Sequence, residues 1–137
     1  MIYSDTDLKY VLLTFKRIAV VGLSSSPDRA SYGVSKYMQG QGYEITPIRP
    51  ENKTILGVSS KQSLRDVPNP LEIVNVFRKN DAVPALVEEA ILCGAKVLWL
   101  QEGVYHQESE KKAREAGIIV FSDLCILKEH VRLLGKR

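Results

Sequence analysis

Short apolar segments alternate with longer amphipathic segments along the chain, and this alternation constrains the fold more than any other feature. Five segments have the continuous apolar character of strands buried on both faces. They cover residues 18–22, 44–48, 71–77, 96–100 and 118–121. Helices are expected at residues 4–15, 32–41, 83–91, 108–116 and 126–134. Strands that alternate with helices run parallel and are joined by right-handed crossovers. The sequence therefore predicts an α/β fold, a Rossmann-like doubly wound sheet of about five parallel strands in the order 3-2-1-4-5, with helices on both faces.

Length and charge favour a single cytoplasmic domain. The chain has 137 residues and no repeat or Pro-rich linker, so we expect one domain over residues 1–137, with an N-terminal helix at 4–15 and a core at 16–134. The net charge is only +3, with Lys and Arg interspersed among Asp and Glu, which disfavours nucleic acid as a partner. No apolar run approaches about 20 residues and the first residues are polar and acidic, so neither a membrane span nor a signal peptide is expected. A homodimer is left open.

The loop after the first predicted strand has the features of a diphosphate site. In open α/β sheets, ligands bind at the carboxyl ends of the strands where the strand order reverses, here between the first and fourth strands. Gly22 permits a sharp turn, while Ser24 and Ser25 offer hydroxyl and backbone N–H groups. The next helix directs its positive end to the same place. The alternative is a polar turn without a ligand.

The second predicted strand ends at a cation. The dinucleotide motif G-x-G-x-x-G is absent, since Ser24 replaces its second glycine. An NAD protein usually places an acidic residue after the second strand, but this chain has Arg49, with Lys53 nearby. A guanidinium there suits a phosphorylated ribose, which NADP and coenzyme A (CoA) both carry. The alternative is a solvated surface arginine.

Further candidate contacts follow the third and fourth predicted strands. Phe77 offers an aromatic plane to an adenine and Arg78 a cation to phosphate, although Phe77 is equally compatible with the core. After the fourth strand, Gln101 offers an amide to a polar chain and Gly103 allows close backbone approach.

Several short motifs occur in a characteristic order. They are Gly22-Leu23-Ser24, Pro50, Val76-Phe77-Arg78, Leu100-Gln101-Glu102-Gly103, Glu115-Ala116-Gly117, Asp123-Leu124-Cys125 and Glu129-His130. Together they resemble the stand-alone CoA-binding domain proteins, which are similar to the CoA-binding N-terminal domain of the succinyl-CoA synthetase alpha subunit. The resemblance covers about residues 15–134.

The resemblance implies a set of cofactor contacts. The pyrophosphate would be held by Gly22, Ser24 and Ser25. The phosphorylated adenosine would be approached by Arg49, Pro50 and Lys53, although many relatives carry Asn in place of Arg49. The nucleotide would be flanked by Phe77, Arg78 and Val83, and the pantetheine arm by Gln101, Glu102 and Gly103. The predicted set is completed by Arg29 and Tyr32.

No constellation of residues indicates catalysis or metal binding. His130 falls on the apolar face of the last helix and is expected in the core, while His106 lacks an oriented carboxylate and is expected at the surface. Cys93 is expected to be inert, and no metal site is expected. Cys125 precedes the last helix, and we hypothesise that it meets the thiol of CoA and forms a mixed disulfide.

These observations favour a non-catalytic protein that binds CoA or an acyl-CoA as a carrier, sensor or buffer. One alternative is an NADP-dependent oxidoreductase, which the fold and Arg49 favour. The missing second glycine and the lack of room for a substrate domain disfavour it. Another alternative is an accessory subunit of a synthetase-like complex that binds no ligand.

Overall fold

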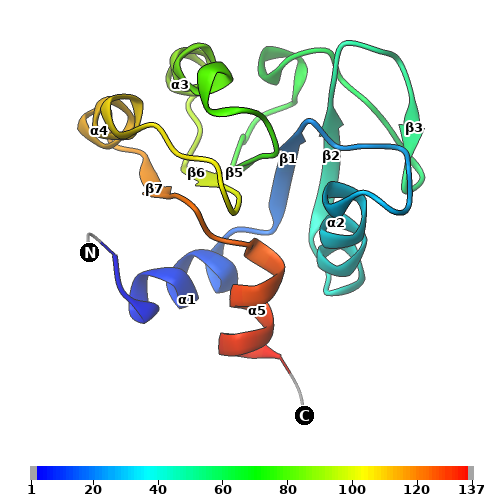
Figure 1. Ribbon diagram of the computed structural model, residues 1–137, viewed down its shortest axis with the longest axis horizontal. Helices are drawn as coiled ribbons and strands as arrows, with labels where there is room; N and C mark the ends of the chain where they lie inside the picture. Colours follow the sequence, from blue (N-terminus) through cyan, green and yellow to red (C-terminus); the bar gives the residue numbers. More distant parts are fainter. Residues whose placement is uncertain (1–2, 136–137) are drawn as a thin grey trace.

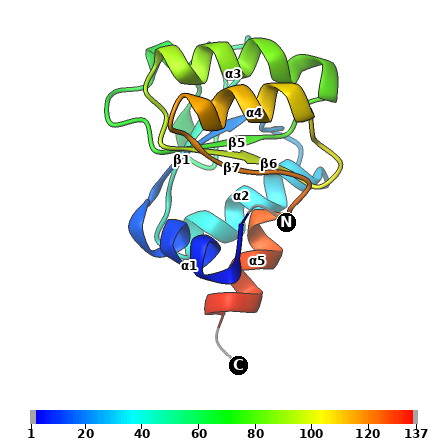
Figure 2. The same cartoon turned by 90° about the vertical axis from the view of Figure 1, so that its left-hand side faces the viewer.

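Five parallel strands form a sheet between two layers of helices (Figure 1). The computed structural model describes residues 3–135. The strands of the sheet are β1 (Arg17–Val21), β2 (Glu44–Ile48), β5 (Ile73–Val76), β6 (Val97–Leu100) and β7 (Ile119–Phe121). Figure 2 shows α3 (Val83–Leu92) and α4 (Gln107–Glu115) on one face of the sheet, and α1 (Asp5–Thr14), α2 (Ala30–Gly40) and α5 (Ile126–Leu134) on the other. This arrangement confirms the predicted Rossmann-like doubly wound α/β fold.

The connection from β2 to β5 contains three short elements. These are the hairpin strands β3 (Thr54–Ile55) and β4 (Val58–Ser59), and the 3-10 turn η1 (Leu64–Asp66). A second 3-10 turn, η2 (Asn80–Ala82), leads directly into α3. Across the described residues, no helix combines the length and apolar character that crossing a bilayer requires.

The strand order differs from the predicted one. The order is β2-β1-β5-β6-β7, which is 2-1-3-4-5 when the five strands are numbered along the chain, so the predicted order 3-2-1-4-5 is wrong. β5 pairs with β1 on one side and β6 on the other, as suits a strand buried at every position. The outer edge of β2 is occupied instead by Lys61, which donates its N–H to the carbonyl of Pro47 and accepts the N–H of Arg49, both at 2.9 Å.

The two sides of the sheet carry separate apolar cores. One core lies under α1, α2 and α5 and includes Trp99 and Phe121, whose ring centroids are 4.8 Å apart. The other lies under α3 and α4. Helix α1 begins with a capping box, in which the side chains of Ser4 and Asp7 each accept the backbone N–H of the other residue. Because helices cover both faces of the sheet, the carboxyl ends of the strands and the loops that follow them are the expected place for a ligand site.

Candidate functional site

The carboxyl ends of β1, β2 and β5 lie side by side. Val21, the last residue of β1, is paired with Ile48 at the end of β2 and with Val76 at the end of β5. The chain leaves β1 toward α2 on one face and leaves β5 toward α3 on the other (Figure 1, Figure 2). The point where the connections diverge is therefore between β1 and β5, not between the first and fourth strands as predicted.

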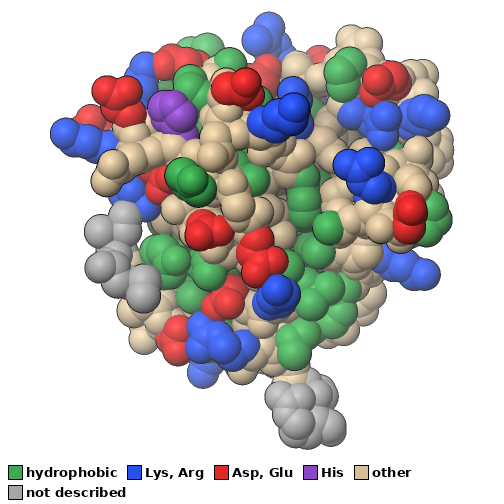
Figure 3. Space-filling model, viewed as in Figure 1, with side chains coloured by type: hydrophobic (Ala, Val, Ile, Leu, Met, Phe, Trp, Pro, Cys, Tyr) green, Lys and Arg blue, Asp and Glu red, His purple; other side chains and the backbone are tan. Residues whose placement is uncertain are grey.

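A hollow of about 290 Å³ opens at these strand ends, and we call it the first hollow. Its lining comprises Gly22, Leu23, Ser24, Arg29, Ile48, Arg49, Pro50, Glu51 and Arg78. Six of these nine residues belong to the predicted cofactor-binding set, since only Leu23, Ile48 and Glu51 were not predicted. Figure 3 shows several Lys and Arg side chains over the part of this face where Figure 1 places β2 and β3.

Hydrogen bonds of Ser24 hold the loop after β1 in shape, one of them to Ser31 of α2. The N–H of Ser24 donates to the hydroxyl of Ser31 at 2.9 Å, and the hydroxyl of Ser24 accepts the N–H of Ser26 at 3.0 Å. The N–H groups of Leu23 and Ser25 have no acceptor among residues 3–135. The loop therefore keeps two free backbone donors, which is the chemistry that an anion requires.

Arg49 ties the loop after β1 to the loop after β2. Its Nη1 donates to the carbonyl oxygen of Leu23 at 2.9 Å, and its Nε and Nη2 each lie 3.0 Å from Glu51 Oε1. The backbone N–H of Glu51 and the guanidinium of Arg49 both lower the pKa of the Glu51 carboxyl. Arg49 thus lines the first hollow, and part of its charge is balanced by Glu51.

Two other arginines at the first hollow have no such counter-ion. Arg29, the residue that precedes α2, and Arg78, which follows β5, are exposed. Neither forms an ion pair with another residue of the part of the chain that the structure describes. Three guanidinium groups and one carboxylate therefore surround the hollow, and this balance favours an anionic ligand.

A second hollow of about 370 Å³ adjoins the first at Arg78. Its lining comprises Phe77, Arg78, Lys79, Gln101, Glu102 and Val104. Because Arg78 lines both hollows, a long ligand that enters one can extend into the other along the ends of β1, β5 and β6.

Several residues at the second hollow already have partners in the protein. Gln101 is only 5% exposed, and Glu102 forms an ion pair with Lys128 of α5 at 2.9 Å. The N–H of Gly103 donates to the carboxylate of Asp123 at 2.6 Å. Gly103 therefore joins the loop after β6 to the loop after β7, and it lines neither hollow.

The remaining predicted contacts lie outside both hollows. Ser25 and Lys53 are exposed, Tyr32 packs beside the core under α2, and Val83 is fully buried in the core under α3. Cys125 is the residue that precedes α5, and it is 7% exposed within the core. The roles predicted for these five residues remain predictions.

The two histidines lie where the sequence predicts. His130 is buried, its Nδ1 lies 2.8 Å from the hydroxyl of Tyr37, and burial together with the charge of Lys16 lowers its pKa. His106 lies at the start of α4, where its Nδ1 accepts the N–H of Ser109 at 3.3 Å. Cys93 is partly buried, and this burial raises the pKa of its thiol. None of these three residues lines either hollow.

Two polar residues of the site were missed. Glu51 follows Arg49 closely in the sequence, and an acidic residue beside a candidate phosphate-binding cation is a signal for an ion pair. Asn75 interrupts the apolar run of β5 and is 1% exposed, which is a signal for a buried hydrogen-bonded group. Its amide donates to Trp99 and to Gln101 at the second hollow.

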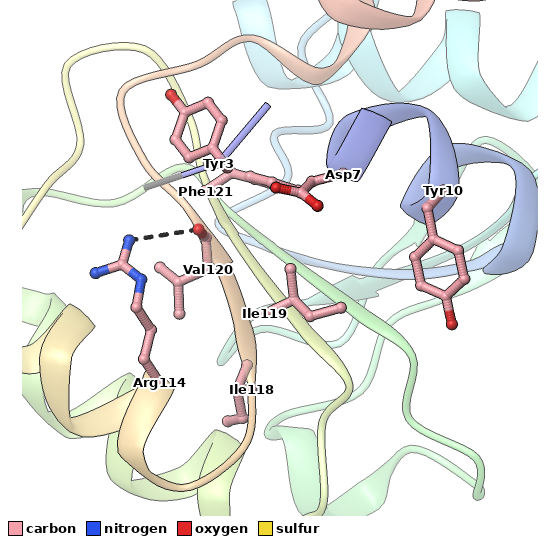
Figure 4. A pocket seen from close by; sticks show the side chains of 8 residues that line it. All are labelled: Tyr3, Asp7, Tyr10, Arg114, Ile118, Ile119, Val120 and Phe121. Carbon is pink, nitrogen blue, oxygen red and sulfur yellow. Dashed lines mark hydrogen bonds between the residues drawn. The ribbon is translucent and has the colours of Figure 1, made fainter. Parts of the chain in front are cut away.

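A separate hollow of about 230 Å³ lies at the opposite edge of the sheet, between α1, β7 and α4 (Figure 4). Arg114 reaches from α4 to donate to the carbonyl oxygen of Val120 at 3.4 Å, and Tyr3 packs edge-on against Phe121. It contains none of the predicted cofactor contacts and does not adjoin the carboxyl ends of β1 and β5.

Known proteins with similar sequences or structures supply independent information. A family model described as "CoA binding domain" matches residues 16–131. The uncharacterised protein YneT of Bacillus subtilis (strain 168) is 44% identical over 127 residues, which cover 93% of this chain and 94% of that protein. The solved structure of a hypothetical protein from Pyrococcus horikoshii OT3 is 40% identical, with a TM-score of 0.93 over 97% of this chain and 94% of that one.

A much longer relative is also similar. The 4-hydroxybutyrate–CoA ligase (ADP-forming) of Nitrosopumilus maritimus (strain SCM1) is 30% identical over 115 residues, which cover 79% of this chain but only 16% of the ligase. The family model, by contrast, covers most of this chain, including both hollows. This chain belongs to the CoA-binding domain family.

Proposed function

We propose that this protein binds CoA or an acyl-CoA at the carboxyl ends of its parallel strands, as a non-catalytic carrier, sensor or buffer. The observation that carries the proposal is the first hollow, which is lined by three arginines and by Leu23, whose backbone N–H has no acceptor among residues 3–135. The arginines are Arg29, Arg49 and Arg78. The adenosine of CoA carries a diphosphate and a 3′-phosphate, so its charge matches this lining.

The adjoining second hollow supports a ligand with a long arm. Its lining combines the apolar Phe77 and Val104 with the polar Gln101 and Glu102. A pantetheine arm has both characters, since it carries amide groups on an aliphatic chain. The proposed pose places the diphosphate in the first hollow, and the arm passes Arg78 into the second.

A ligand panel tests this proposal. A ligand at about 100 times its dissociation constant stabilises a protein by about 2.7 kcal/mol, which is readily measured by thermal unfolding. We expect CoA and acetyl-CoA to raise the unfolding midpoint, dephospho-CoA to raise it less, and NADP to raise it little. An NADP shift equal to that of CoA would favour the oxidoreductase alternative, and no shift with any compound would favour an accessory subunit.

Arginine variants test which phosphate of CoA each arginine binds. Arg78→Ala is expected to weaken CoA and dephospho-CoA alike by about tenfold or more, because a charge-assisted hydrogen bond is lost. Arg49→Ala is expected to abolish the preference for the 3′-phosphate, and an unchanged preference would remove Arg49 from that role. Arg65→Ala is the control, since Arg65 is 72% exposed and pairs with Glu89 away from both hollows.

A thiol contact at Cys125 is part of the same proposal. Cys125 directly precedes Ile126, whose N–H donates to Gln101 at the second hollow. In an exchange with CoA disulfide, the sulfur of Cys125 would bond to one CoA sulfur and release the other CoA as a thiol. Intact mass of the wild type and Cys125→Ser after incubation with CoA disulfide decides the question, and equal adducts on both proteins would end the idea.

A further inference from the structure

Gln101 is a buried amide at the edge of a hollow. It directly follows β6, lines the second hollow and is only 5% exposed. A side-chain amide has two donor hydrogens and one acceptor oxygen, and a buried amide normally satisfies both ends. The orientation of its oxygen and nitrogen therefore decides what the second hollow offers to a ligand.

A chain of hydrogen bonds fixes the orientation of Gln101. The carbonyl oxygen of Trp99 can only accept, so the Asn75 atom that lies 3.1 Å from it is the NH₂ group. The same nitrogen lies 3.2 Å from the side chain of Gln101 and donates to it. The atom of Gln101 that receives this bond must therefore be Oε1.

A second donor leads to the same assignment. The backbone N–H of Ile126, in the first turn of α5, points at the same Oε1 at 2.9 Å. Flipping the amide would place the NH₂ of Gln101 against two other donors, which is unfavourable on both sides. Nε2 then has no hydrogen-bond acceptor among residues 3–135. It is not among the fully buried side-chain atoms that lack a hydrogen-bond partner, so Nε2 is accessible in part. The accessible part of Gln101 therefore presents its NH₂ group to the second hollow that it lines.

We propose that Gln101 Nε2 is a fixed hydrogen-bond donor for a carbonyl oxygen in the arm of the bound ligand. This inference rests on the proposed function and deepens it, because it states which chemical group the second hollow recognises. Leaving a largely buried donor unpaired is costly, so a ligand that supplies an acceptor is selected over one that does not. Two carbonyl sources qualify, namely an amide of the pantetheine arm and the thioester of an acyl group.

The variant Gln101→Glu isolates the donor. Glutamate has nearly the same shape and keeps an oxygen for Asn75 and Ile126, but it replaces the NH₂ group by a second oxygen. Gln107→Glu is the matched control, because it makes the same change on an exposed residue at the start of α4 that lines neither hollow. Binding is measured by calorimetry with adenosine 3′,5′-bisphosphate, which lacks the arm, with S-ethyl-CoA, which lacks the thioester carbonyl, and with acetyl-CoA.

The three probes separate the two sources. If an amide of the arm is bound, Gln101→Glu weakens acetyl-CoA and S-ethyl-CoA by about tenfold more than the bisphosphate. If the thioester is bound, only acetyl-CoA shows this additional loss. Equal changes for all three probes, or no change, would overturn the assignment of Gln101 and leave CoA binding intact. If the wild type binds none of the probes, the proposed function itself fails, and the inference with it.

A measurement on the wild type keeps the test valid if Gln101→Glu does not fold. The side-chain amide protons of Gln101 are followed by nuclear magnetic resonance during titration. We expect a downfield shift with acetyl-CoA and none with the bisphosphate, because only the former carries a carbonyl oxygen into the second hollow. The same shift with both ligands, or no shift with either, would overturn the inference.

Discussion

A methyl group placed on Gly22 would lie 2.4 Å from the carbonyl oxygen of Phe77 and 3.0 Å from Cδ of Arg78. Gly22 also has a φ of +87°, in the region that favours glycine. The residue after β1 therefore packs against the residues after β5 with no room for a Cβ atom, and the aliphatic stem of Arg78 lies beside Gly22. The shape of the first hollow depends on the absence of a side chain at one position.

Gly22→Ala is expected to destabilise the protein by about 2 kcal/mol or more, because the methyl group meets backbone atoms and the positive φ is strained. Gly33→Ala is the control, since Gly33 lies within α2 with nothing within 4 Å of the added methyl group. It should stabilise the protein by about 0.5–1 kcal/mol through helix propensity. Urea unfolding of both variants measures the difference, and equal effects would contradict the steric argument.

The sequence predicts where the strands and helices lie along the chain better than it predicts which strands are adjacent in the sheet. Alternating apolar runs identify all five strands of the sheet, and Gly22 is correctly placed at a tight turn. The order of the strands depends on what covers the outer edge of β2, and Lys61 covers it from an irregular segment without periodicity. Local patterns contain no information about such a distant pairing.

The candidate site shows the same division. Residues that directly follow a strand, such as Arg49 and Arg78, gather at the first hollow because parallel strands end at one edge of the sheet. The hydrogen-bond partners of each polar side chain were not predictable from the sequence. Gln101, for example, is oriented by Asn75 and by the first turn of α5, which lie far from it along the chain. The residues that line the hollows were therefore predicted more readily than the hydrogen bonds that orient their side chains.

Glu51→Gln is expected to tighten the binding of CoA by about two- to fivefold at low ionic strength, and less at high salt. The reason is that the Glu51 carboxylate accepts from Arg49 at the first hollow, where it competes with phosphate for the guanidinium. Glu44→Gln is the control, because Glu44 is similarly exposed and pairs with Arg17 at the other end of β2. Calorimetry at two salt concentrations measures the change, and equal gains for both variants would indicate a general charge effect.

We expect His130 to make the stability of the protein depend on pH. Burial lowers its pKa in the folded state, and the nearby charge of Lys16 adds to this effect. As the pH falls below about 6.5, the unfolded chain binds a proton at this position before the folded protein does, so the free energy of unfolding decreases. The hydroxyl of Tyr37 and the ring of Tyr43, whose centroid lies 5.7 Å from that of His130, also face the imidazole.

Unfolding experiments between pH 5 and pH 8 test this dependence. His130→Gln is expected to flatten the decrease at acidic pH, because it removes the titrating group. His106→Gln, which changes a partly exposed residue at the start of α4, is the comparison and is expected to retain the decrease. A decrease of equal size in the wild type and in His130→Gln would show that other groups cause it.

We expect Tyr43 to make the stability of the protein depend on pH at the alkaline end of the range. Its hydroxyl donates to the carbonyl oxygen of Leu12 at 2.5 Å, and burial raises its pKa to about 12. The unfolded chain ionises this tyrosine near pH 10, so the folded state holds its proton longer. The stabilisation is therefore complete below pH 10 and is lost as the pH rises from 10 toward 12.

Tyr43→Phe is expected to cost about 1 kcal/mol at neutral pH, because the carbonyl of Leu12 loses a donor, and to weaken the loss of stability at alkaline pH. Tyr10→Phe is the control, because Tyr10 is 55% exposed on α1, and its free energy of unfolding should stay within about 0.5 kcal/mol of the wild type. The measurements are urea unfolding at neutral and alkaline pH and spectroscopic titration of tyrosinate. The prediction fails if Tyr43→Phe loses stability above pH 10 as steeply as the wild type, because the buried hydroxyl between α1 and β2 would then not be the group that titrates.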